Sequence, residues 1–69
     1  MRPHPIIAEL RAARQQQGLS QAAIAALMAN GASQGMITYL ETGRRWPLLE
    51  TVDDWAYTLG YEIVLRKRA

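Results

Sequence analysis

The chain has 69 residues, of which 49% are hydrophobic and 20% charged, and its net charge is +2. This length allows one small domain and excludes two, and the balance of apolar and charged residues excludes a disordered chain. There is no cysteine, so disulfides and thiolate metal sites are excluded as well. The slight excess of basic charge permits a nucleic acid or an acidic partner and requires neither.

No apolar run approaches the roughly 18 residues that a membrane-spanning helix needs, and the start of the chain has no apolar segment typical of a signal peptide. We therefore expect a cytoplasmic protein without a membrane partner.

The first predicted helix runs from about Pro5 to Gln17. Proline is favoured in the first turn of a helix, where its missing N–H is not needed. Gly18 follows the last helical residue and is a typical stop. Apolar residues at helical spacing define the expected buried face: Ile6, Leu10 and Ala13, with Ile7 and Arg14 flanking it.

The second and third predicted helices each begin at a serine. Ser20 and Ser33 are both good N-caps, and the second helix is rich in alanine, the best helix former. Asn30-Gly31 ends the second helix and Gly43 follows Thr42 at the end of the third. The expected inward residues are Ile24, Leu27 and Met28 in the second helix, and Ile37 and Leu40 in the third, with Met36 beside them.

A fourth helix is predicted from about Leu49 to Leu59. Its apolar stripe follows the i, i+3, i+4, i+7 spacing, at Val52, Trp55, Ala56 and Leu59. We expect both tryptophans, Trp55 on this helix and Trp46 in the preceding loop, to lie in the core.

Residues 61–66 break with the helical pattern. Apolar side chains alternate there with Glu62, Val64 and Arg66, which predicts a β-strand. A lone strand leaves its backbone groups unpaired, so we expect it to pair with the same strand of a second copy; a frayed tail or one more helical turn is the alternative. The expected dimerisation residues are Tyr61, Ile63, Val64 and Leu65.

The outer face of the third helix is polar. It carries Gln34, Gly35, Thr38 and Tyr39, and Arg44-Arg45 follows the helix. Two short helices joined by a glycine-containing turn, with hydrogen-bonding side chains on the outside of the second, are what binding in the DNA major groove requires. The arginines would then reach phosphates. The alternative is an ordinary solvated helix face beside a basic loop.

The ordered motifs from position 10 to 47 resemble the helix-turn-helix of the lambdoid phage repressors and Cro proteins (the XRE family). The matching segments include Gly18-Leu19-Ser20-Gln21, Gly31-Ala32-Ser33-Gln34 and Leu40-Glu41-Thr42-Gly43-Arg44. With the fourth helix included, the resemblance covers about positions 6 to 60. Met28-Ala29-Asn30 holds two residues more than the usual pattern, so the second helix or the turn must be longer.

The resemblance implies a role for each matched residue. Base-facing positions are Gln34, Gly35, Thr38 and Tyr39. Phosphate contacts are Gln21, Ser33, Arg44 and Arg45, with Gln21 also bracing the third helix. Arg14 and Glu41 match a pair that forms a partly buried salt bridge in the family.

The expected fold is an all-α domain, 1–69, of four to five short helices containing a helix-turn-helix, with its core at about 5–60 and a dimerisation strand at 61–66. The resemblance implies a Cro-like phage or prophage repressor that binds a pseudo-palindromic operator in double-stranded DNA as a homodimer. The alternative function is an antitoxin whose main partner is a toxin protein and which regulates its own operon.

The sequence shows no constellation of catalytic or metal-binding residues. His4 is a lone histidine between prolines, and Asp53 and Asp54 are adjacent, so their side chains point in different directions on a helix. A nucleophile–base set, a phosphate-binding glycine loop and metal-ligand spacing are all missing. We expect no enzyme activity, no cofactor and no metal.

Overall fold

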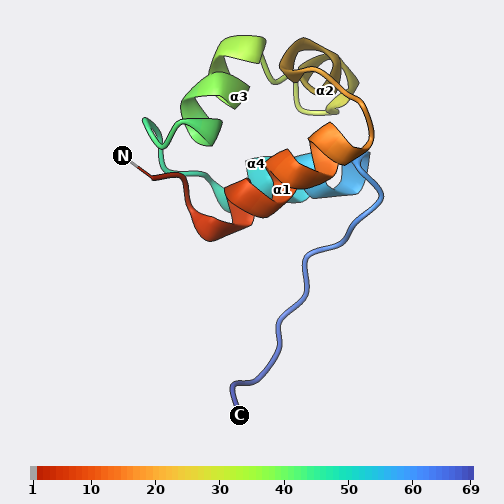
Figure 1. Cartoon of the computed structure of the whole chain (residues 1–69). Coiled ribbons are helices and arrows are strands. Elements are labelled where there is room, and N and C mark those ends of the chain that lie inside the picture. Colours follow the sequence, from red (N-terminus) through yellow and green to blue (C-terminus); the bar gives the residue numbers. More distant parts are fainter. Residues whose placement is uncertain (1) are drawn as a thin grey trace.

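Residues 2–69, which the computed structural model describes, form four α-helices and no strand (Figure 1). The helices are α1 (Pro5–Gln16), α2 (Gln21–Leu27), α3 (Gln34–Glu41) and α4 (Leu49–Thr58). Their bounds lie close to the predicted ones, so the prediction of four helices is confirmed; Met1, which the predicted domain includes, lies outside the described residues. None of the helices in this range is long and apolar enough to cross a membrane.

Side chains and glycines set the helix ends. The hydroxyl oxygens of Ser20 and Ser33 accept the N–H of Ala23 at 3.0 Å and of Met36 at 3.1 Å, so both serines are N-caps as predicted. His4 caps α1, because its Nδ1 accepts the Ile6 N–H at 3.1 Å. The starts of α1, α2 and α3 are therefore encoded by residues next to them in the sequence.

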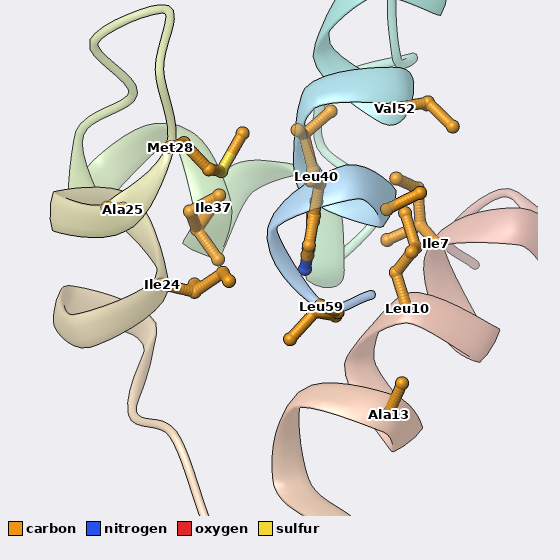
Figure 2. Packing of buried hydrophobic residues seen from close by; sticks show 12 residues of the cluster. Ile7, Leu10, Ala13, Ile24, Ala25, Met28, Ile37, Leu40, Val52 and Leu59 are labelled. Atoms are coloured by element: carbon orange, nitrogen blue, oxygen red, sulfur yellow. The ribbon is translucent and has the colours of Figure 1, made fainter. Parts of the chain in front are cut away.

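The core lies where α2 and α3 pack against the pair formed by α1 and α4 (Figures 1 and 2). Trp55 is fully buried, and the whole predicted stripe of α4 is buried with it. The largest side chains shielded completely from solvent come from all four helices: Ile7, Ile24, Ile37, Leu40 and Trp55. Burying such side chains supplies most of the stability of a domain this small.

Three apolar side chains do not lie where the sequence predicted them. Leu27 is 60% exposed, because the inward face of α2 is formed by Ile24, Ala25 and Met28 and Leu27 lies beside it. Trp46 is 69% exposed, so the expectation of a core tryptophan in the loop is wrong. On α1 the buried face is centred on Ile7, and Ile6 is only half-buried.

The predicted strand over 61–66 is also wrong for the single chain. Residues 61–69 form an extended segment that leaves the domain after α4 (Figure 1), and all nine are exposed. A strand needs a neighbouring strand to satisfy its backbone N–H and C=O groups, and within residues 2–69 there is no second strand. Tyr61, Ile63, Val64 and Leu65 therefore carry apolar surface into solvent.

Candidate nucleic-acid interface

Helix α3 is held by one face and presents the other. Ile37, Leu40 and Glu41 are buried on the inner side. Gln34, Gly35 and Tyr39 are exposed on the outer side. The sequence produces this division because apolar and polar side chains alternate at helical spacing over eight residues. A helix anchored in this way presents a fixed polar surface.

A buried ion pair joins α1 to the end of α3. Arg14 Nε donates to Glu41 Oε2 and Arg14 Nη2 to Glu41 Oε1, both at 2.8 Å. This is the two-pronged geometry that suits a guanidinium and a carboxylate. Both residues are only 7% exposed. The remaining Nη1 of Arg14 donates to the Leu19 carbonyl at 2.7 Å, which also fixes the turn before α2.

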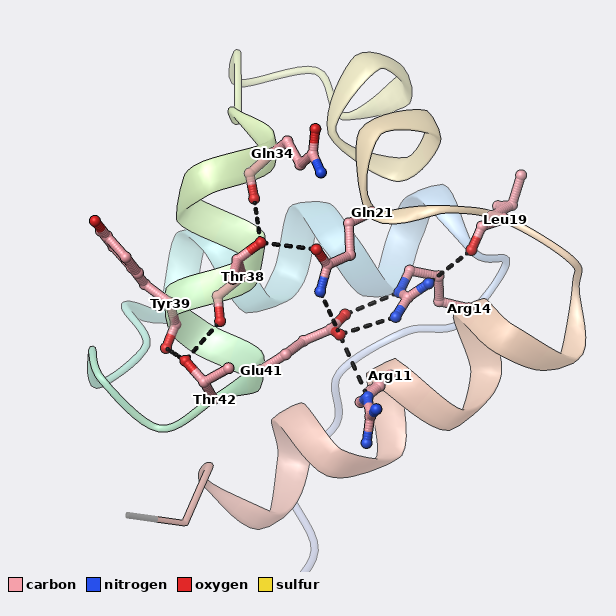
Figure 3. A network of polar contacts seen from close by, with 9 residues as sticks. All are labelled: Arg11, Arg14, Leu19, Gln21, Gln34, Thr38, Tyr39, Glu41 and Thr42. Atoms are coloured by element: carbon pink, nitrogen blue, oxygen red, sulfur yellow. Dashed lines mark hydrogen bonds and ion pairs between the residues drawn. The ribbon is translucent and has the colours of Figure 1, made fainter.

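A single amide connects that ion pair to the outer face of α3 (Figure 3). Gln21 Nε2 donates to Glu41 Oε1 at 3.0 Å, and Thr38 Oγ1 donates to Gln21 Oε1 at 2.7 Å. The Thr38 hydroxyl also lies 3.0 Å from the Gln34 carbonyl. Gln21 thus holds α3 against α2. Thr38 is half-buried, whereas Gln34 and Tyr39 are exposed to solvent.

The loop after α3 carries two exposed arginines. The backbone N–H groups of Arg44 and Arg45 both donate to the Tyr39 carbonyl, at 2.9 and 3.3 Å, so the loop is folded back on the end of the helix. Within residues 2–69 neither guanidinium forms an ion pair. Ser33, at the opposite end of α3, is exposed and uses its hydroxyl oxygen as the N-cap.

A family model described as helix-turn-helix matches residues 10–65. The chain belongs to the helix-turn-helix family of the XRE (Cro repressor) type. None of the curated proteins and none of the solved structures matches it. The match covers most of the chain, and α2 and α3 are the two helices of the motif, so this is a DNA-binding regulator.

The helix-turn-helix motif of this protein has a turn that α4 secures. Because α2 stops at Leu27, the extra residues predicted from the sequence lengthen the turn and not the helix. The Asp54 carboxylate, which is 7% exposed on α4, accepts the N–H of Ala29 at 3.0 Å and of Asn30 at 2.9 Å. Hydrogen bonds to an ionised acceptor are stronger than those between neutral groups. The Asp54 carboxylate therefore fixes the path of the chain into α3.

Sequence reasoning did not single out Asp54 as part of the motif. Its partners lie 24 and 25 positions earlier in the chain, so no local spacing connects them. The one available signal was an acidic residue between Val52 and Trp55 in the apolar stripe of α4. A buried carboxylate requires hydrogen-bond donors, and here the N–H groups of Ala29 and Asn30 in the lengthened turn are those donors.

Proposed function

We propose that this helix-turn-helix protein binds a specific site in double-stranded DNA as a homodimer and represses transcription, as a small Cro-like regulator. The observation that carries the proposal is the fixed orientation of α3. Its inner face is locked by the core and by the Arg14–Glu41 pair, while Gln34 and Tyr39 project outward. A helix presented in this way fits the major groove, where base edges can be distinguished.

In this proposal the outer side chains of α3 meet the bases. The Gln34 amide can pair with adenine through two hydrogen bonds. The Tyr39 ring can contact a thymine methyl group, or its hydroxyl a phosphate. Gly35 has no side chain, so DNA could approach the helix closely there; the space beside it is open, with only the Ser33 Oγ 3.9 Å from where a Cβ would lie. Thr38 is half-buried and its hydroxyl hydrogen is directed to Gln21 or to the Gln34 carbonyl, so it would contact a base only through a lone pair of its oxygen.

Phosphate contacts would come from both ends of α3. Arg44 and Arg45 are exposed without an acidic partner in residues 2–69, and arginine is suited to phosphate oxygens. Ser33 lies at the other end of the helix. Gln21 would use the second N–H of its amide, because the other hydrogen and the oxygen are engaged with Glu41 and Thr38. These contacts would set the register of the helix on the duplex.

The homodimer would form through the C-terminal segment. Val64 is 70% exposed and Leu65 fully exposed, and Leu48 and Leu49 expose more apolar surface at the start of α4. Ile63 connects the two groups, because it lines one hollow together with Leu48 and Leu49. Exposed apolar surface of this kind marks interaction sites. Pairing of residues 61–66 with the same segment of a second copy would satisfy the backbone and cover the side chains. Two α3 helices about 34 Å apart would then enter successive major grooves.

The test is selection of binding sites from random duplex DNA at near-physiological salt. The proposal expects a two-fold symmetric sequence, with half-sites one helical turn apart, to be enriched. Enrichment of a single unpaired half-site would refute the dimeric part. Binding without any sequence preference, sensitive only to salt, would refute base reading by α3.

A second candidate is an antitoxin that binds a toxin protein, and the same exposed apolar segment favours it. The apolar residues are followed by Arg66-Lys67-Arg68, which suits an acidic partner surface. Sedimentation of the purified chain separates the two functions. A stable dimer at micromolar concentration supports self-association, whereas a monomer that becomes ordered at its C-terminus only with a second protein supports the antitoxin.

A further inference from the structure

The N-terminal segment, residues 2–4, is docked on the loop that follows α3. A Cβ atom at Gly43 would lie 2.6 Å from both the carbonyl carbon and the carbonyl oxygen of Arg2, and 3.0 Å from Pro3 N. Real side chains do not approach backbone atoms that closely. Gly43 also has a φ of +79°, which glycine adopts without strain. This glycine therefore serves both the end of α3 and the close approach of the segment.

Close approach is particular to Gly43 among the glycines with positive φ. Gly18, Gly31 and Gly60 have φ values of +73°, +77° and +89°, yet a Cβ at any of them would have nothing within 4 Å. Ending a helix thus does not by itself require such crowding in this protein.

His4 and Trp46 provide a second attachment. Their ring centroids are 4.8 Å apart at an interplanar angle of 78°, an edge-to-face arrangement that is favourable between aromatic rings. His4 is itself fixed, because its Nδ1 caps α1. Pro3 and Pro5 restrict the backbone on either side. The exposed Trp46, displaced from the core, therefore has a role in holding the segment.

Docking brings a third arginine to the end of α3. Arg2 is exposed, as are Arg44 and Arg45, and in residues 2–69 none of the three forms an ion pair. Glu41, the nearest acidic residue in sequence to this loop, is buried against Arg14. Figure 1 shows the first described residues (red) beside this loop and far from the C-terminal end. The end of α3 therefore carries three exposed arginines that form no ion pair within residues 2–69.

We infer that Arg2 is a DNA-phosphate contact alongside Arg44 and Arg45, and that Gly43 positions it there. This inference rests on the proposed binding of DNA by α3, and it extends the contact surface to a residue outside the matched range of 10–65. The ligand is a duplex phosphate, since an exposed arginine whose backbone is held next to a groove-binding helix can reach the DNA backbone that flanks the groove.

The first experiment measures the salt dependence of affinity, on the full chain, for a duplex carrying the selected site and for a scrambled duplex of equal length. Arg2→Ala should reduce the slope of log affinity against log salt by about one per subunit, and so by about two for the proposed dimer, on both duplexes. The wild-type chain should then lose about 12-fold more affinity than the variant between about 50 and about 200 mM salt. Arg68→Ala, which removes the same charge from the distant tail, should change the slope less. Equal slopes for Arg2→Ala and wild type, or equal losses in the two variants, would overturn the inference.

The second experiment tests the positioning by Gly43. Gly43→Ala should displace residues 2–3 and lower the slope about as much as Arg2→Ala, and the double variant should show no further loss. A loss from Gly43→Ala that is undiminished in the Arg2→Ala background would mean that the glycine acts on Arg44 and Arg45 directly, and this would refute its role. Gly18→Ala, which has similar backbone strain and open space at the end of α1 and lies outside the turn before α3, is the matched control.

If Gly43→Ala does not fold, Trp46→Ala replaces it, since Trp46 is exposed and its loss removes the contact with His4. Its effect on affinity should likewise vanish when Arg2 is already absent; an effect that persists would refute the docking argument. Failure of the wild-type chain to prefer the selected duplex would instead contradict the proposed function. A preference retained by both wild type and Arg2→Ala, with unchanged slope, would contradict only the inference about Arg2.

Discussion

Replacing Glu41 by alanine should remove a large part of the stability of this domain. The change leaves the Arg14 guanidinium buried, 7% exposed, with the Leu19 carbonyl as its only remaining acceptor. Breaking one side of a buried pair typically costs about 3–5 kcal/mol. A chain of 69 residues has roughly 3.5–10 kcal/mol of stability in total. Glu41→Ala should therefore lower the free energy of unfolding by about 4 kcal/mol.

The reverse substitution should cost less. Arg14→Ala strands the Glu41 carboxylate, but Gln21 Nε2 remains at 3.0 Å and Arg11 Nε at 3.4 Å. The Arg11 side chain is 54% exposed, so it can approach with little loss of hydration. We expect a cost of about 2–3 kcal/mol, within the range for a lost charged hydrogen-bond partner. Replacing both residues by methionine removes both charges together and should cost less than Glu41→Ala alone.

Urea unfolding, followed by circular dichroism and tryptophan fluorescence, measures all three variants. Trp55 is fully buried, so its emission reports loss of the core, while the exposed Trp46 contributes a nearly constant background. The reasoning is refuted if Arg14→Ala destabilises as much as Glu41→Ala, because the reserve donors would then be irrelevant. It is also refuted if Glu41→Ala costs less than about 1 kcal/mol, the range of a surface ion pair.

Three further predictions concern the base contacts, the turn and the tail. Gln34→Ala should weaken binding to the selected site by about 1–3 kcal/mol and relax the preference at one base pair. The control Gln15→Ala, at an exposed position on α1, should do neither. An unchanged preference in a repeated selection would show that Gln34 does not contact a base. Asp54→Ala should lower the free energy of unfolding in urea by about 2 kcal/mol, because two N–H groups of the turn lose a charged acceptor. Asp53→Ala, at the exposed neighbouring position, should change it by no more than about 0.5 kcal/mol. Equal losses in the two variants would show that the hydrogen bonds from the turn to Asp54 do not stabilise the domain. Truncation after Gly60 should leave a folded monomer with weaker operator binding, because residues 61–69 contribute no buried side chain to the single chain. A truncated chain that still sediments as a dimer would show that the dimer interface lies elsewhere.

The sequence predicted what depends on neighbouring residues. Ser20 and Ser33 begin α2 and α3 because a cap needs only the next turn of the helix, and the stripe of α4 is buried because its spacing leaves no other choice. Leu27 was misplaced because the inward face of α2 is centred on Ile24, Ala25 and Met28, and which side of a short alanine-rich helix turns inward depends on how it packs on the other helices. The prediction of a strand at 61–66 was wrong for a similar reason: alternating apolar residues indicate the two faces of a strand, but they do not show that a second strand is present to pair with it.

The candidate site was predictable in outline for the same reasons. The outer positions of α3 follow from which side of the helix is apolar, whereas the attachment of the N-terminal segment at Gly43 involves a contact across about forty residues. Nothing in the sequence distinguishes Gly43 from the other glycines that end helices, because all share the same backbone requirement. Only packing separates a glycine that stops a helix from one that also admits another segment.

The amide of Gln21 has a consequence for the chemical character of the exposed helix. Glu41 accepts hydrogen bonds only, so the nitrogen of Gln21 must face it and the oxygen must face Thr38. The single hydrogen of the Thr38 hydroxyl is then directed inward, to Gln21 or to the Gln34 carbonyl, and lone pairs alone remain outside. A buried negative charge thereby sets the polarity of a surface group two side chains away. A ligand group that hydrogen-bonds to Thr38 must therefore be a donor, such as an exocyclic amino group of adenine or cytosine; a carbonyl oxygen would find no hydrogen to accept.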